Sequence, residues 1–229
     1  MILHELYFAG LGDESRPGAV LTEALARDFG SVERWRAEFV AMGKAQGGGS
    51  GWVLLTWSPR DRRLINAWAA DHTTTLAGGQ PILALDMYEH AYHMDFGAAA
   101  AAYVDAFMAN IDWSRLYARY QRAVEQCSEA FSASHDDAAN AHLVDVRRAG
   151  AFELADALIE GAEWRDPGQV DAWASHLPAD KEIVVYCVYG HEVGRATAMR
   201  LRAAGINARF LRGGFDGWKA AGGPLSPKR

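Results

Sequence analysis

The chain has 229 residues, of which 50% are hydrophobic and 23% charged, and its formal net charge is -6 at pH 7. A chain of this length buries a sizeable core and accommodates two domains of ordinary size. The negative charge argues against nonspecific nucleic-acid binding, and no apolar run approaches the roughly 20 residues that a membrane-spanning helix needs. There is no secretory signal pattern, and the two cysteines give no disulfide framework, so we expect a soluble cytoplasmic protein.

The first half of the chain has the pattern of helices around a small sheet. Apolar residues recur at helical spacing in residues 1–11, 20–29 and 32–46. After a glycine-rich break, the strand pattern appears in residues 52–57, 64–70 and 82–85. Two more helices are predicted over residues 98–109 and 113–122. Residues 1–122 are therefore expected to form an α+β domain with a three-stranded antiparallel sheet.

Residues 81–96, PILALDMYEHAYHMDF, are the first candidate for chemistry. Asp86 and His90 arrive four residues apart in apolar and aromatic surroundings, and either a helix or a strand-to-helix turn brings both inward. A carboxylate and an imidazole together are typical metal ligands. The alternative is that Asp86 caps a helix and that His90 is an ordinary hydrogen-bonded histidine.

The run DMYEHAYHMDF is similar to the Asp-x-Trp-Glu-His-Ala-Tyr signature of the iron/manganese superoxide dismutases. Three more stretches resemble parts of that family, in the family's order: HELYF from His4, GGGSGWVLL from Gly47 and IDWSRLYARYQ from Ile111. The resemblance covers residues 1–122. It implies that His4, Asp86 and His90 bind iron or manganese and that superoxide is the substrate.

The same resemblance implies roles for residues around the metal. His72 corresponds to a glutamine or histidine that hydrogen-bonds the metal-bound solvent, although an exposed loop histidine is the alternative. Trp52 and Tyr88 correspond to aromatic residues that wall the pocket. Glu89 corresponds to a residue that bridges to the partner's ligand, which implies a homodimer through the segment around residues 89–90. His93 stands where the family usually has a tyrosine at the substrate entrance.

One part of the family pattern is not found in this sequence. In the family, the helix that carries His4 is the second arm of a helical hairpin, whose first arm supplies another histidine ligand and a tyrosine. Three candidate ligands remain, and the fourth is expected from water, from His93 after local rearrangement, or from an upstream segment.

Residues 123–141 are rich in alanine, serine and charge, and we predict a linker there, with Cys127 as an incidental thiol. From residue 142 to residue 229, strand and helix patterns alternate, which predicts an α/β domain with a parallel sheet.

The segment EIVVYCVYGHEVGRATAMRLRAAGINARFLRGGFDGW resembles rhodanese domains, and Asp145 and Arg147 match the family's Asp-x-Arg entry strand. Loop amides and a helix N-terminus would stabilise a thiolate or persulfide at Cys187. Cys187 and His72 are the two candidate catalytic residues of the chain. Glu192 stands where sulfur-transferring members commonly carry a cation, and a carboxylate there raises the thiol pKa and repels anions. The family's His-Ile-Pro-Gly-Ala segment is also replaced, by IEGAEWRDP.

These patterns favour a superoxide dismutase-like metalloenzyme. The alternative is a rhodanese-type sulfurtransferase or a sulfur- and redox-sensing protein that acts through Cys187 beside a degenerate dismutase domain. A third possibility is a non-enzymatic redox-responsive interaction protein. Iron and manganese are not distinguished by ligand type, because both accept histidine and carboxylate.

Overall fold

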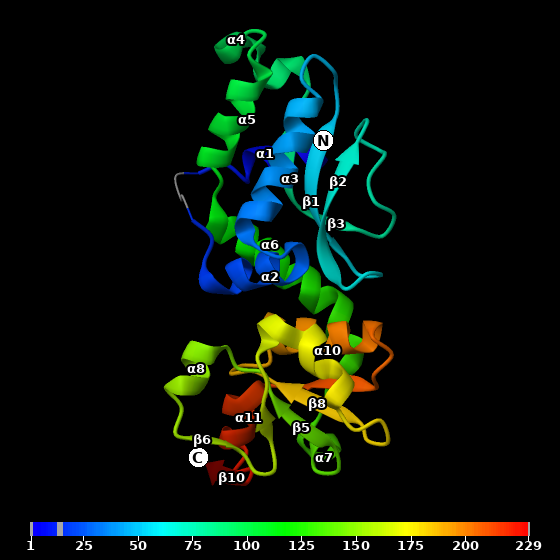
Figure 1. Cartoon of the computed structure of the whole chain (residues 1–229), viewed down its shortest axis with the longest axis vertical. Helices are drawn as coiled ribbons and strands as arrows, with labels where there is room; N and C mark the ends of the chain where they lie inside the picture. Colours follow the sequence, from blue (N-terminus) through cyan, green and yellow to red (C-terminus); the bar gives the residue numbers. More distant parts are fainter. Residues whose placement is uncertain (1, 13–15, 229) are drawn as a thin grey trace. The chain divides into compact units, whose positions relative to one another are not determined.

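The computed structural model describes residues 2–12 and 16–228. The chain divides into two compact units, Met1–Ala123 and Val124–Arg229, and each has its own sheet (Figure 1).

The first unit is α+β, as the sequence predicts. Its strands form an antiparallel sheet in the order β2-β1-β3 and are β1 (Trp52–Ser58), β2 (Arg63–Ala69) and β3 (Gln80–Asp86). Its helices are α1 (Ile2–Phe8), α2 (Ala19–Phe29), α3 (Val32–Ala45), η1 (Glu89–Ala91), α4 (His93–Phe96), α5 (Ala100–Ala109) and α6 (Trp113–Ser128), the last running on past the unit boundary.

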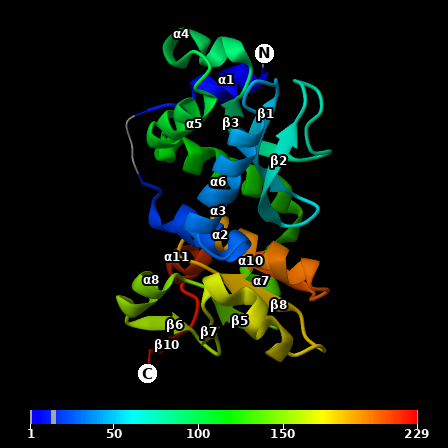
Figure 2. The same cartoon turned by 45° about the horizontal axis from the view of Figure 1, so that its top comes forward.

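The central strand β1 organises this unit, because every residue of WVLLTWS is buried. Helices α2 and α3 pack beside β2 and β1, and α1 packs against β3 (Figure 2). Helix α3 begins at Ser31, whose hydroxyl accepts a hydrogen bond from the Arg34 amide at 3.1 Å. Gly43 lets α3 approach the core closely, since a Cβ there would lie 2.9 Å from Leu85 Cδ2. This packing places the end of β3 beside α1.

The second unit is α/β, again as predicted. Five parallel strands have the order β4-β9-β8-β5-β7 and are β4 (Ser132–Ala133), β5 (His142–Asp145), β7 (Glu163–Trp164), β8 (Ile183–Tyr186) and β9 (Ala208–Leu211). A separate antiparallel pair consists of β6 (Ala157–Ile159) and β10 (Leu225–Pro227).

The α-helices of this unit are α7 (His135–Ala138), α8 (Ala149–Glu153), α9 (Val170–Trp173), α10 (Glu192–Ala203) and α11 (Gly214–Ala220). Three 3-10 turns are η2 (Glu129–Phe131), η3 (Pro167–Gln169) and η4 (Ala174–His176). Across residues 2–12 and 16–228 of the whole chain, no helix is long and apolar enough to cross a bilayer.

The structure differs from the prediction of a linker at residues 123–141. Helix α6 continues to Ser128 because Tyr120 and Val124 extend its buried stripe at helical spacing. Strand β4 then pairs with β9. Ser134 and Asp137 form a reciprocal capping box at the start of α7, and the hydrogen bonds from Ser134 lower the pKa of Asp137 to about 2. The alanines and serines of this segment therefore serve packing and capping.

We expect Gly43→Ala to destabilise the first unit by about 1–3 kcal/mol, because the added methyl group overpacks Leu85 and Val104. Urea unfolding followed by tryptophan fluorescence measures the change. As a control, Gly150→Ala adds the same methyl group to a helix where nothing lies within 4 Å, and it should not lower stability. Equal stability of Gly43→Ala and the parent would contradict the packing account.

Candidate functional site

Three elements of the first unit bring His4, Asp86 and His90 together. Strand β3 ends at Asp86, helix α1 carries His4 against that strand, and η1 carries His90. Asp86 Oδ2 lies 3.5 Å from His4 Nε2 and 3.2 Å from His90 Nε2. One ligand atom from each of the three residues lies within 4.8 Å of the other two.

The carboxylate of this cluster is buried and the imidazoles are open to solvent. The Asp86 side chain is 2% exposed, whereas those of His4 and His90 are 32% and 59% exposed. Asp86 Oδ1 accepts a hydrogen bond from the Tyr88 amide at 2.9 Å, which leaves Oδ2 to face both imidazoles. This hydrogen bond closes a local turn after Asp86, as expected for an aspartate that caps the following segment. The same carboxylate also belongs to the cluster with His4 and His90.

The cluster fits a metal ion by its chemistry and its spacing. Nitrogen and carboxylate ligands about 2.0–2.2 Å from one ion lie roughly 3–3.5 Å apart in tetrahedral geometry, close to the two distances above. Among the described residues, no other group of three such side chains lies this close together. His93 is exposed on α4 and does not belong to the cluster. His4, Asp86 and His90 are therefore the residues that could hold a metal.

Aromatic residues line one side of the cluster. Trp52 Nε1 donates a hydrogen bond to His72 Nδ1 at 2.9 Å, and the His72 ring centroid lies 4.9 Å from that of His4. Tyr88 stacks on His90 at a centroid distance of 5.6 Å. His72 thus lies beside His4 and is exposed to solvent. Its role in hydrogen-bonding a metal-bound solvent stays a prediction.

The loop that carries His72 is held by Asp71. Its Oδ1 accepts four hydrogen bonds of 2.7–2.8 Å from the amides and hydroxyls of Thr73 and Thr74. These bonds hold the pKa of Asp71 well below its ordinary value. The ADHTTT segment is thus a turn that hydrogen bonds to Asp71 hold in place, and His72 belongs to this turn.

A pair of tyrosines behind Asp86 was not found by sequence reasoning. The Tyr103 hydroxyl donates to the Asp86 carbonyl at 2.8 Å and lies 3.1 Å from the Tyr7 hydroxyl. Burial is the largest cause of the raised pKa of both hydroxyls. Tyr103 follows three alanines in AAAYVDAF, and a polar aromatic after such a run of small residues was the available signal.

The second unit holds Cys187 at the end of β8, against the first turn of α10. Burial raises the pKa of the Cys187 thiol and Glu192 adds to the rise, while backbone hydrogen bonds at Gly194, Gly190 and His191 lower it. The thiol itself donates a hydrogen bond to the His191 carbonyl at 3.9 Å. A Cβ on Gly194 would lie 3.3 Å from Cys187 Sγ, so the sulfur rests directly on the helix.

The loop after Cys187 is closed by α11. The Phe215 amide donates to the Cys187 carbonyl at 2.9 Å. A Cβ on Gly214, whose φ is +58°, would lie 2.5 Å from the same carbonyl oxygen. Behind this contact, the buried Arg147 guanidinium is hydrogen-bonded to Asp145 and lies 4.3 Å over the Phe215 ring. The Asp-x-Arg pair therefore supports the loop from beneath.

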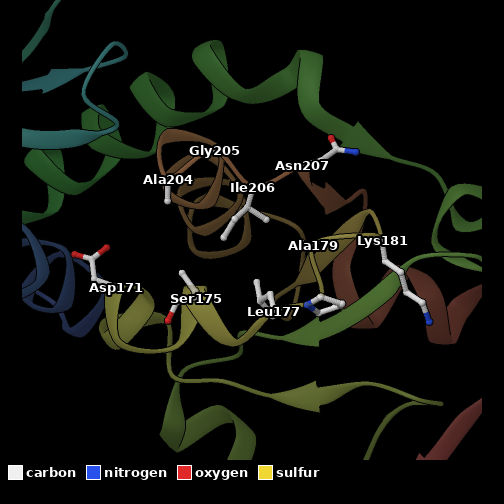
Figure 3. Close-up of a pocket in the computed structure, with 11 residues that line it drawn as sticks. Asp171, Ser175, Leu177, Ala179, Lys181, Ala204, Gly205, Ile206 and Asn207 are labelled. Carbon is white, nitrogen blue, oxygen red and sulfur yellow. The ribbon is translucent and has the colours of Figure 1, made fainter.

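The second unit also has a cavity of about 510 Å³ (Figure 3). Leu177 and Ile206 form its apolar wall, and Lys181 and Asn207 stand at its rim. Lys181 and Asn207 precede β8 and β9, whereas Cys187 follows β8, so the cavity and the thiol lie at opposite ends of the parallel strands.

Fold and site together define a two-domain protein. An α+β unit with a cluster of two histidines and one aspartate precedes an α/β unit with a cysteine at a strand end. The C-terminal domain of iron/manganese superoxide dismutases matches residues 17–119, and the rhodanese-like domain matches residues 129–221.

Named proteins agree with the first match. The chain is 69% identical over 124 residues to "Superoxide dismutase [Fe]" of Cupriavidus metallidurans, which covers 54% of this chain and 63% of that protein. It is 41% identical over 127 residues to "Superoxide dismutase [Mn] 2" of Haloferax volcanii, covering 54% and 62%. "Superoxide dismutase [Mn] 1" of Haloferax mediterranei is 37% identical over 108 residues, covering 46% and 73%.

The chain belongs to the iron/manganese superoxide dismutase family, whose C-terminal domain it joins to a rhodanese-like domain. It spans 60% to 63% of the length of the first six relatives.

Because Trp52 donates to His72 Nδ1, the neutral imidazole of His72 should carry its hydrogen on Nε2. Trp52→Phe removes this donor, and we expect the Nδ1–H tautomer to become populated. The ¹⁵N chemical shifts of the imidazoles in histidine-labelled protein report the change. Tyr88→Phe keeps the Trp52 donor and should leave the tautomer as in the parent. A mixed tautomer in the parent would contradict the assignment.

Proposed function

We propose that the first unit is a superoxide dismutase centre in which His4, Asp86 and His90 hold one iron or manganese ion. The observation that carries the proposal is the buried Asp86 carboxylate with two imidazole nitrogens at 3.2 and 3.5 Å. The relatives named as iron and manganese superoxide dismutases support the choice of metal and substrate.

The bound metal would supply the change of oxidation state that takes an electron from one superoxide and gives it to the next. The residues of this chain bind and orient. Asp86 and the two histidines provide one negative charge and two neutral donors, a set that both metals accept. The formation of peroxide from superoxide consumes protons. His72, with its hydrogen on Nε2, would place a hydrogen-bond donor beside His4, where such protons are needed.

The proposal extends to a homodimer and to a cytoplasmic location. Glu89 and His90 are exposed and adjacent in η1, and Met94 on the following helix is 90% exposed. Such a surface next to the site is suited to an interface with a second copy of the chain. The family resemblance around Glu89 is the other support.

Purified protein should contain about one iron or manganese ion per chain, measured by elemental analysis. His90→Ala should lose the metal and the dismutase activity, because it removes one of three ligands. His176→Ala is the control: it removes an exposed histidine of the second unit and should keep both. Metal retention by His90→Ala, or no metal in the parent after growth with both metals, would contradict the proposal.

A second candidate function is thiol chemistry of the rhodanese type at Cys187. The observation that favours it is the position of the sulfur against the first turn of α10, where a Cβ on Gly194 would lie 3.3 Å from Sγ. The match of residues 129–221 to the rhodanese-like domain supports the same reading. This function is additional to the metal centre and does not replace it.

In a Cys127→Ser background, the rate at which iodoacetamide alkylates Cys187 should rise with pH. The midpoint pH of this rise should lie above that of a free thiol, because burial raises the Cys187 pKa. Glu192→Gln should lower the midpoint, since it removes a negative charge, but not to the ordinary value, since burial remains. Rates measured from pH 6 to 11 give both midpoints. A parent midpoint at or below that of a free thiol would contradict this account.

A further inference from the structure

The first unit has a polar cavity of about 320 Å³ where the turn between α2 and α3 meets strand β2. Helices α2 and α3 contact each other, and both contact β2, which lies at the edge of the sheet. All three elements contribute residues to the lining of the cavity, and none of these residues is His4, Asp86 or His90. The cavity is therefore a candidate site separate from the metal-type cluster.

Two guanidinium groups line this cavity, those of Arg34 on α3 and Arg63 on β2. Arg63 Nη2 donates to the Asp28 carbonyl at 2.8 Å, whereas Arg63 Nε is buried and has no hydrogen-bond partner among the described residues. The Arg34 guanidinium is exposed and forms no ion pair within the described part of the chain. Guanidinium groups with free N–H donors bind phosphate and carboxylate oxygens, often through two parallel hydrogen bonds.

The two carboxylates that line the cavity do not cancel this positive charge. Asp28 is buried, and both of its oxygens accept hydrogen bonds of 2.8 Å from the Arg27 guanidinium, so that pair is neutral as a whole. Glu38 Oε1 accepts a hydrogen bond from Asn66 Nδ2 at 3.0 Å. Arg34 and Arg63 thus face one carboxylate, that of Glu38, which has no cationic partner among residues 2–12 and 16–228. The balance favours an anionic ligand.

Asn66 adds a hydrogen-bond acceptor to the cavity. Because the Glu38 carboxylate only accepts hydrogen bonds, Asn66 presents its NH₂ group to Glu38 and keeps Oδ1 for another partner. Asn66 Oδ1 is buried and has no hydrogen-bond partner in the described part of the chain. A buried acceptor is costly when it is left unpaired, so a ligand that donates a hydrogen bond to Oδ1 is favoured. Hydroxyl groups are small donors of this kind.

We propose that this cavity binds small phosphate monoesters that carry hydroxyl groups. Arg34 and Arg63 bind the phosphate oxygens, and Asn66 Oδ1 accepts a hydrogen bond from a ligand hydroxyl. A phosphate monoester suits the site better than a carboxylate, because it brings nearly two negative charges and three acceptor oxygens to two guanidinium groups. The cavity volume of about 320 Å³ lies at the lower end of the range for ligand pockets, which suits a molecule of this size.

The test is isothermal titration calorimetry of the full chain in a phosphate-free buffer at constant ionic strength. Two probes are compared: glycerol 3-phosphate, and ethyl phosphate, which has the same charged group without hydroxyls. Arg34→Gln and Arg63→Gln each remove one guanidinium group. Arg34→Gln leaves the hydrogen bond from Arg63 to Asp28 in place, so it tests the site without loss of that contact. Arg60→Gln is the matched control, because it makes the same charge change at an exposed position outside the cavity.

We expect Arg34→Gln and Arg63→Gln each to weaken the binding of both probes about tenfold, and Arg60→Gln to bind like the parent. The parent should bind glycerol 3-phosphate about threefold more tightly than ethyl phosphate, and Asn66→Ala should abolish that difference. The absence of saturable binding by the parent overturns the proposal, and so does equal weakening by Arg34→Gln and Arg60→Gln. Equal affinity of the parent for the two probes overturns the assigned ligand class. The metal content of the same samples tests the dismutase proposal separately.

Discussion

The first unit depends on one buried carboxylate shared between two imidazoles. Asp86 stands at the last residue of β3, where the strand leaves the core, and its Oδ2 lies within 3.5 Å of both His4 and His90. A carboxylate 2% exposed is stable there only because polar groups surround it. The Tyr88 amide on one side and the Tyr103 hydroxyl at its carbonyl hold it in place. The sheet, helix α1 and the aromatic residues beside the cluster together fix the position of Asp86.

In the second unit, some neighbours of Cys187 stabilise its thiolate and others destabilise it. Amides at the start of α10 stabilise negative charge on Cys187, while burial and Glu192 disfavour it. Burial is the largest of these effects, so the pKa of the Cys187 thiol lies above its ordinary value. The same chain thus joins a cluster of metal-type ligands to a buried thiol at the end of β8.

Much of the fold was predictable because periodicity is local. The buried run of β1 and the helical spacing of α2 and α3 identify their elements, and the alternation after residue 142 predicts the parallel sheet. The stretch of residues 123–141 was not predictable in this way. Its alanines and serines resemble a linker, and only pairing with β9 turns two of them into a strand. Strand β10 is likewise formed by a partner far away in sequence.

The sequence by itself determined the residue types of the site: a strand-end aspartate with a histidine four residues later, and a cysteine before a glycine-containing loop. The family resemblance added His4 to this set, but local pattern could not, because His4 and Asp86 are 82 positions apart and it is the packing of α1 on β3 that brings them to 3.5 Å. Tertiary structure also decided that Glu192 is buried and that the Tyr103 hydroxyl bonds the Asp86 carbonyl. Local pattern encodes which groups a segment carries, whereas burial and long-range contact arise only when distant segments share one core.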